Sequence, residues 1–293
     1  MEKQGLIIKL LGGIYFVEAS DVVYECKAKG SFRNKNFSPV CGDKVEIQIK
    51  DNETPTIVKV FDRKSLIIRP QLANLDCLVL VNSVCEPSPN MLLIDKFIAI
   101  AEYKGIEPVV VFTKIDKKSE NDLVSVYKKA GVKVFSVDNT TGMGSEELKE
   151  LLKGRLSAFT GNTGVGKSSL LNNLFPGLNL DTGEISKKLG RGKHTTRHVE
   201  LFKLSDGGYI ADTPGFSSFD TNRYDIIFKD ELASCFREFD DFLGKCKFQD
   251  CYHINEPGCE VIRAVNDGII SKSRHESYVQ MFEEAKNLKE WEH

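Results

Sequence analysis

Residues 161–168 read Gly-Asn-Thr-Gly-Val-Gly-Lys-Ser, and this stretch decides the fold. It matches the phosphate-binding P-loop pattern in full, because its three glycines let the backbone wrap around phosphates with its N–H groups pointing inward. The apolar run Leu156–Thr160 before it predicts a strand. Lys167–Leu174 after it predicts a helix, whose N-terminus attracts anions. The sequence therefore predicts an α/β domain that binds a nucleotide.

Within this loop the chemistry of each position is specific. Lys167 is expected to neutralise the β- and γ-phosphates, and the Ser168 hydroxyl to bind Mg²⁺. The expected phosphate-contacting residues are Gly161, Asn162, Thr163, Gly164, Val165, Gly166, Lys167, Ser168 and Ser169. These residues bind the phosphates of any nucleotide, so the base must be chosen elsewhere.

Thr113-Lys114-Ile115-Asp116 indicates guanine. The Asp116 carboxylate can accept hydrogen bonds from the guanine N1–H and exocyclic amine, whereas adenine offers no such donor pair. Lys114 is expected to pack its aliphatic stem over the base, and Thr113 replaces the commoner Asn. Ser136-Val137-Asp138, after another predicted strand, is a weaker candidate whose backbone N–H groups would meet the guanine O6.

Two further segments resemble the switches of GTP hydrolases. Asp212-Thr213-Pro214-Gly215 follows a predicted strand, so that Asp212 lies near Mg²⁺ and the Gly215 N–H reaches the γ-phosphate. Between it and the P-loop, Thr195 and Thr196 are both candidates for the threonine that closes on Mg²⁺. Phe216 stands where many such enzymes have a water-orienting Gln, and His194 is the nearest alternative for that role.

The order of the motifs is unusual. A conventional GTPase has the P-loop first and the guanine motif last, but here Thr113–Asp116 precedes the P-loop. We therefore expect a circularly permuted sheet, which is physically tolerable when the original termini lie close together at the surface. Alternating predicted strands and helices from about residue 72 to residue 211 favour a parallel-rich sheet covered on both faces.

The first 68 residues have a different pattern. Five short predicted strands, separated by turn signals such as Gly12-Gly13, indicate a small barrel. An OB-fold has this strand count, and an SH3-like barrel is the alternative. The segment Lys27–Lys35 carries four basic residues and no acidic one, so it is either a solvated loop or a contact for a phosphate backbone.

A cysteine and histidine cluster marks the C-terminal region. The ligands of the expected metal site are Cys246, Cys251, His253 and Cys259. Three thiolates and one imidazole suit a tetrahedral structural Zn²⁺, which would add folding free energy to a small helical domain. The remaining cysteines are expected to be small buried core residues, and His275–Trp291 is expected to form one amphipathic helix.

Composition excludes some classes of protein. The chain has 293 residues and a net charge of −2, so bulk charge does not indicate nucleic-acid binding. No apolar run is long enough for a transmembrane helix, and no signal peptide is visible. We therefore expect a cytoplasmic, monomeric protein without a membrane partner, in which disulfides are not expected.

Taken together, these motifs resemble the ribosome small-subunit-dependent GTPase A (RsgA) family over essentially the whole chain. The resemblance implies an OB-fold at 1–68, a permuted GTPase domain at 69–220 and a zinc-binding helical domain at 221–293. It also implies GTP hydrolysis stimulated by the 30S ribosomal subunit, a role in late 30S assembly, and contacts with 16S rRNA. A GTP-dependent RNA-binding module is the main alternative; a metal-stabilised ATP-using protein is disfavoured by Asp116.

Overall fold

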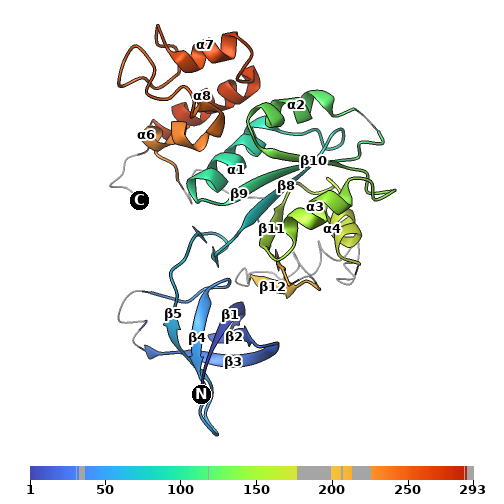
Figure 1. Cartoon of the computed structure of the whole chain (residues 1–293), viewed down its shortest axis with the longest axis vertical. Helices are drawn as coiled ribbons and strands as arrows, with labels where there is room; N and C mark the ends of the chain where they lie inside the picture. Colours follow the sequence, from blue (N-terminus) through green and yellow to red (C-terminus); the bar gives the residue numbers. More distant parts are fainter. Residues whose placement is uncertain are drawn as a thin grey trace.

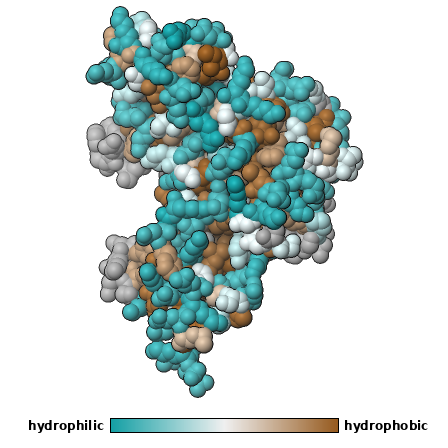
Figure 2. Space-filling model, in the orientation of Figure 1, coloured by the Kyte–Doolittle hydropathy of each residue, from teal (hydrophilic) through white to brown (hydrophobic). Residues whose placement is uncertain are grey.

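The computed structural model describes residues 1–30, 32, 37–117, 119–176, 199–205, 207–212, 226–286 and 288. The chain passes from a barrel through a central sheet with helices to a C-terminal helical region (Figure 1). The outline is indented between the barrel and the C-terminal region, and brown apolar side chains gather over the middle of the molecule (Figure 2). Both ends of the chain are thus built onto the central domain.

The N-terminal barrel contains β1 (Glu2–Leu11), β2 (Ile14–Ala19), β3 (Val22–Ala28), β4 (Lys44–Gln48) and β5 (Thr56–Val60). Strand β1 pairs with both β2 and β4, and β3 pairs in parallel with β5, which itself pairs with β4. The barrel is therefore closed in the order β1-β2-β3-β5-β4, as in an OB-fold, and the SH3-like alternative is excluded. Its core is a cluster of buried apolar side chains that includes Ile7, Val17 and Ile47.

Alternating strands and helices form the central domain. Its elements are β8 (Cys77–Ser83), α1 (Met91–Tyr103), β9 (Glu107–Thr113), α2 (Asn121–Lys129), β10 (Lys133–Val137), α3 (Ser145–Leu152), β11 (Leu156–Thr160), α4 (Lys167–Leu174), β12 (Glu200–Lys203) and β13 (Tyr209–Asp212). The strand order is β10-β9-β8-β11-β13-β12. Among the described strands of this order, β12 alone is antiparallel to its neighbour, β13. The expected parallel-rich sheet is confirmed.

Helices cover both faces of this sheet, because successive residues of its strands point to opposite sides. Leu78 and Leu80 of β8 pack in one core with residues of α1 and α2. Val79 and Val81 of the same strand pack in a second core with residues of α3 and α4. Burial on both faces explains why the central strands read as continuous apolar runs.

The strand order also shows how the permutation is built. The strands β8, β9 and β10 come first in the chain but form one half of the central sheet, and β11, β13 and β12 form the other half. The two halves meet where β8 pairs with β11. The guanine motif therefore precedes the P-loop in sequence although the two lie on neighbouring parts of one sheet.

A short hairpin and a strand pairing are among the described connections between the barrel and the central domain. The short strands β6 (Leu66–Ile67) and β7 (Leu72–Ala73) pair with each other, so Arg69-Pro70 lies in their turn, across the boundary proposed from the sequence. Strand β1 also pairs with β12 through Lys9 and Glu200. This pairing extends the barrel strands and the central strands into one 11-stranded sheet.

The C-terminal region is helical, as expected. It contains α6 (Lys229–Leu232), η4 (Ala233–Cys235), η5 (Arg237–Phe239), α7 (Glu260–Asn266) and α8 (Lys272–Ala285). Helix α8 begins three residues before the expected His275 and ends at Ala285; parts of the sequence after it lie outside the described residues. An apolar cluster joins Phe236, Phe239 and Tyr278 to Ile100 of α1. Within the described residues, no helix is both long enough and apolar enough to cross a membrane.

Candidate functional site

Four strands of the parallel run β10-β9-β8-β11-β13 carry the predicted nucleotide motifs at their carboxyl ends. Thr113 ends β9, Val137 ends β10, Thr160 ends β11 and Asp212 ends β13. In open α/β sheets this edge is where ligands bind. Motifs that are up to about a hundred residues apart in the chain are therefore brought to one edge of the sheet.

The P-loop has the backbone conformation that its glycines predict. Gly161 has φ +154°, and a Cβ there would lie 2.3 Å from the Val81 carbonyl oxygen. Gly166 has φ +89° and is the N-cap of α4, a position that only glycine adopts readily. Asn162, Thr163 and Gly164 are exposed at the tip of the loop, whereas Val165 is buried beneath it.

The two side chains expected to act on phosphate and Mg²⁺ begin helix α4. The Lys167 ammonium donates to the Gly161 carbonyl at 3.4 Å, a long hydrogen bond that folds the side chain back over the loop. Ser168 and Ser169 are half-buried in the first turn. The positive end of the helix dipole adds to the charge of Lys167, so this corner of the sheet attracts an anion.

The guanine motif is tied to the P-loop. Thr113 is fully buried, and its hydroxyl donates to the Val165 carbonyl and approaches the Asn82 carbonyl at 3.2 Å. The Lys114 ammonium donates to the Glu86 carbonyl. Asp116 is exposed in the turn that follows, closed by a hydrogen bond from Lys117 N–H to the Lys114 carbonyl. A carboxylate thus faces solvent at the edge where a base would be read.

The loop after β10 is held by its own aspartate. The Asp138 carboxylate accepts hydrogen bonds from the Thr141 hydroxyl at 2.7 Å and the Thr140 N–H at 2.8 Å. These bonds, the Thr141 hydroxyl first, lower the pKa of Asp138 below its ordinary value, so the carboxylate stays ionised. Ser136 is half-buried on β10 opposite Phe112. Asp138 therefore shapes this loop, and Ser136 stays a predicted guanine contact.

Sequence reasoning missed Asn139, the next residue of this loop. Its amide nitrogen donates to the Gly166 carbonyl at 3.0 Å. Its own carbonyl accepts a hydrogen bond from the Asn173 side chain of α4 at 2.9 Å. The only signal in the sequence was an amide directly after Ser136–Asp138, and nothing in that pattern indicates a contact with the P-loop.

Several predicted residues lie outside the described part of the chain. These are His194, Thr195, Thr196 and Gly215. Asp212 ends β13 beside the P-loop strand, which puts its backbone at the expected edge. The switch assignments therefore stay predictions.

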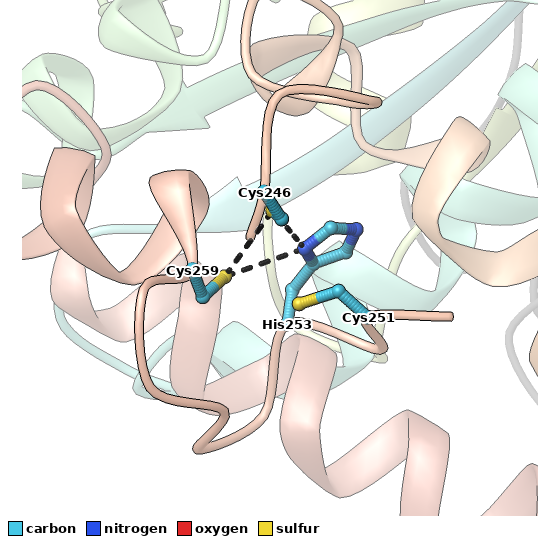
Figure 3. A group of neighbouring side chains, drawn as sticks. All are labelled: Cys246, Cys251, His253 and Cys259. Carbon is cyan, nitrogen blue, oxygen red and sulfur yellow. Dashed lines mark hydrogen bonds between the residues drawn. The ribbon is translucent and has the colours of Figure 1, made fainter. Parts of the chain in front are cut away.

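The four metal-ligand candidates come together in the C-terminal region (Figure 3). Their ligand atoms all lie within 4.8 Å of one another. The Cys246 and Cys259 sulfurs are 3.8 Å apart, and the His253 Nδ1 lies 3.5 Å from the first and 3.4 Å from the second. All four residues come from one loop segment and the start of α7.

These distances fit a tetrahedral zinc ion. Zn–S bonds of about 2.3 Å and Zn–N bonds of about 2.0 Å require S···S edges of about 3.8 Å and S···N edges of about 3.5 Å. Burial lowers the pKa of His253, which favours the neutral imidazole that binds metals. Burial raises the pKa of the Cys251 thiol to about 12, and a bound dication would offset this by stabilising the thiolate.

Backbone groups support the same cluster. The Ile262 N–H donates to the Cys259 sulfur at 3.5 Å, which makes Cys259 the N-cap of α7. The Glu260 N–H donates to the Cys246 sulfur at 3.4 Å. Hydrogen bonds to the sulfurs fix thiolate orientation, and the cluster can therefore hold a structural zinc.

The sheet order, the P-loop and the guanine motif at one edge define a circularly permuted P-loop GTPase. The family models agree: residues 4–57 match the RsgA N-terminal domain, and residues 60–222 match the RsgA GTPase. The chain belongs to the RsgA family, and it is an enzyme that hydrolyses GTP.

Relatives match over nearly the whole chain. The small ribosomal subunit biogenesis GTPase RsgA of Caldanaerobacter subterraneus subsp. tengcongensis is 42% identical, with coverage of 97% of this chain and 96% of the relative. The protein of the same name from Streptococcus pneumoniae is 42% identical, with coverage of 98% and 96%.

Solved structures agree with these relatives. The crystal structure of YjeQ from Thermotoga maritima has a TM-score of 0.83 and 37% identity, and the match covers 99% of this chain and 100% of that one. YloQ, described as a circularly permuted GTPase, has a TM-score of 0.79 and 31% identity, with coverage of 99% and 96%.

Proposed function

We propose that this GTPase acts in the biogenesis of the small ribosomal subunit, that it binds the 30S particle, and that the particle stimulates its GTP hydrolysis. The observation that supports this most is the match to small ribosomal subunit biogenesis GTPases across all three regions of the chain. The barrel and the cysteine cluster flank the GTPase domain in this chain, and we assign docking on the partner to these two regions.

In this proposal the P-loop residues Gly161–Ser169 bind the phosphates. Lys167 offsets phosphate charge, and Ser168 binds Mg²⁺ together with Thr195 or Thr196. Asp212 binds Mg²⁺ through water, and Gly215 contacts the γ-phosphate. The position of the P-loop and of the Asp212 backbone at the carboxyl edge of the sheet supports these roles, and those of Thr195, Thr196 and Gly215 rest on the sequence.

Guanine recognition falls to Asp116, with Lys114 over the base and Thr113 and Ser136 beside it. Asp116 is exposed in a turn fixed by Lys114, so its carboxylate is free to accept two base hydrogen bonds. Because Phe216 cannot orient water, we assign that task to His194, ordered when the subunit docks. Intrinsic hydrolysis is then slow, and a partner that completes the site raises it strongly.

The flanking regions serve the partner. We assign 16S rRNA contacts to the barrel (1–68) and to the zinc-binding region (221–293), on either side of the GTPase domain (69–220). We further propose that the protein works as a cytoplasmic monomer. One Zn²⁺ at Cys246, Cys251, His253 and Cys259 holds the C-terminal region in shape.

Single-turnover GTP hydrolysis, measured with and without purified 30S subunits, tests the main proposal. We expect the rate constant to rise by at least tenfold with 30S, and no rise with 50S subunits as the control. Equal rates with and without 30S would refute stimulation. Such a result would favour the alternative in which nucleotide state only gates RNA affinity.

Guanine recognition is tested with Asp116→Asn. Xanthine carries a carbonyl where guanine has its exocyclic amine, so the variant should lose GTP affinity and gain affinity for xanthosine triphosphate. Competition binding measures both. GTP affinity that matches the unmodified chain would remove Asp116 from the base site.

Water positioning is tested with His194→Ala. The 30S-stimulated rate constant should fall by more than tenfold, whereas GTP affinity should change by less than threefold. If rate and affinity fall together, His194 belongs to nucleotide binding instead.

A further inference from the structure

Two consecutive carbonyls of the P-loop are held from the guanine side of the site. The Thr113 hydroxyl donates to the carbonyl of Val165, and the Asn139 amide donates to the carbonyl of Gly166. Thr113 ends β9, and Asn139 lies in the loop that follows the neighbouring strand β10. The loop that carries the phosphate-binding N–H groups is thus fixed at adjacent peptide units.

The arrangement explains how the chain tolerates a threonine at position 113. An Asn side chain is longer than a Thr side chain and ends in an amide with two N–H groups, whereas the Thr113 hydroxyl is a single donor that contacts the Val165 carbonyl of the P-loop. An amide donor to the P-loop is instead provided by Asn139, which follows β10, the strand next to β9. The Thr113 hydroxyl and the Asn139 amide therefore each donate one hydrogen bond to the P-loop backbone.

Asn139 is held in place for this contact. Its backbone carbonyl accepts from Asn173 of α4, so both its main chain and its side chain are tied to the helix that begins with Lys167. Its amide oxygen is buried and has no hydrogen-bond partner among the described residues. A buried acceptor without a donor is unfavourable, and the bond from the amide nitrogen to Gly166 is the feature that accounts for this side-chain orientation.

We propose that Asn139 is a positioning residue for nucleotide binding, which acts with Thr113 to fix the Val165–Gly166 peptide units so that the P-loop N–H groups face the phosphates. This rests on the proposed phosphate role of Gly161–Ser169. Asn139 does not touch the phosphates; it acts through Gly166. Removing its amide lets the loop move between conformations, and nucleotide binding must then order it again.

The test uses the full chain with Mg²⁺ and a fluorescent GDP analogue, with unlabelled GDP and GTP as competitors. Asn139→Ala should weaken GDP affinity about tenfold, the effect of one lost hydrogen bond to an ordered loop. The KM for GTP should rise more than kcat falls. Asn121→Ala, which removes an exposed amide at the start of α2, is the matched control and should bind GDP as the unmodified chain does.

A rescue separates positioning from a merely structural role. Thr113→Asn in the Asn139→Ala background supplies an amide from β9, and we expect it to recover at least threefold of the lost affinity. The proposal is overturned if Asn139→Ala binds GDP within twofold of the unmodified chain. It is also overturned if Asn139→Ala loses GDP affinity together with a lower thermal unfolding midpoint and the double variant recovers none of that affinity, because the loss is then merely structural. If the unmodified chain binds no GDP, the phosphate assignment itself fails, and this outcome is recognised without any variant.

Discussion

The central domain meets the C-terminal region through buried charges and meets the barrel through half-exposed ones. At the C-terminal joint, Arg274 of α8 is 1% exposed and forms ion pairs with Asp95 of α1 at 2.7 Å and with Glu238 of η5 at 2.7 Å. Two bonds reach Glu238, so the guanidinium is bidentate there. One arginine therefore links an element of the central domain to two of the C-terminal region.

The barrel joint has the opposite character. Lys203 of β12 pairs with Glu18 and Asp21 of the barrel, with the lysine side chain 42% exposed. Lys9 pairs with Glu200 at 2.9 Å across the single register pair between β1 and β12. Exposed pairs are screened by salt and contribute little. The contrast indicates that ion pairs contribute more to the joint with the C-terminal region than to the joint with the barrel, which also shares buried apolar residues such as Leu72 with the central core.

We expect metal removal to have the largest effect of all on the stability of the C-terminal region. Chelation of zinc, or Cys251→Ser, should unfold the segment around α7, because structural zinc sites supply about 10–16 kcal/mol of apparent binding free energy in small peptides. Hydrogen exchange should then show lost protection in 246–266 and unchanged protection in the barrel.

The matched control for that experiment is Cys235→Ala, which removes a buried thiol outside the cluster. It should keep one zinc per chain by elemental analysis. A zinc content far below one per chain in the unmodified protein would show that the cysteine and histidine cluster does not hold zinc.

Arg274→Ala should have the next largest effect. It leaves the buried carboxylates of Asp95 and Glu238 without their partner, which costs about 3–5 kcal/mol. Urea unfolding at pH 7 measures the loss. Arg263→Ala, whose side chain is 67% exposed, should change stability by less than about 0.5 kcal/mol. Equal effects of the two variants would show that the buried ion pairs of Arg274 contribute no more to stability than an exposed one.

A smaller effect is expected at Asp95, because the triad holds two carboxylates and one arginine. Burial raises the pKa of Asp95 despite Arg274, and one of its oxygens has no hydrogen-bond partner among the described residues. A carboxyl with a raised folded-state pKa binds its proton more tightly when folded, so its contribution to stability is present at low pH and declines as pH rises above about 4.

Asp95→Asn removes this decline and leaves the bidentate Arg274–Glu238 pair intact. We expect its unfolding free energy at pH 7 to lie within about 1 kcal/mol of the unmodified chain, with a flatter dependence between pH 4 and pH 7. The difference between the two urea series isolates Asp95, because Glu102, whose pKa burial also raises, is common to both. An unchanged slope would show that Asp95 is ionised throughout.

The barrel joint should respond least. Lys9→Ala removes the ion pair with Glu200 and should cost less than about 1 kcal/mol, and less again at 1 M salt. A cost as large as that of Arg274→Ala would mean that the barrel is held as firmly as the C-terminal region.

The sequence predicted what depends on short patterns. The P-loop, the guanine motif and the four metal-ligand candidates each lie within about fourteen residues, so spacing alone indicated their chemistry. The four metal-ligand candidates come together in the structure, and the roles of the individual residues stay predictions. The strands were also found, since continuous apolar runs are typical of sheets buried on both faces. The permutation followed from motif order.

What the sequence could not predict depends on long-range pairing. Nothing in the pattern around Lys9 indicates that β1 continues into the central sheet through Glu200. Arg274 stands just before the expected start of the last helix, and a lone arginine is ordinarily exposed; only its distant partners Asp95 and Glu238 explain its burial. Asn139 is a loop amide whose partner, Gly166, belongs to another motif.

The permuted strand order also has a consequence for synthesis on the ribosome. The turn that carries Asp116 emerges from the ribosome before the P-loop, and Asp212 emerges last of the motif-bearing strand ends. At about 5–20 residues per second, the interval between the first and the last of them is on the order of 5–20 s. If Asp116 reads the base as we propose, the base-reading part of the site is made first, and a nascent chain becomes able to hold a nucleotide only when the sheet around β11 closes.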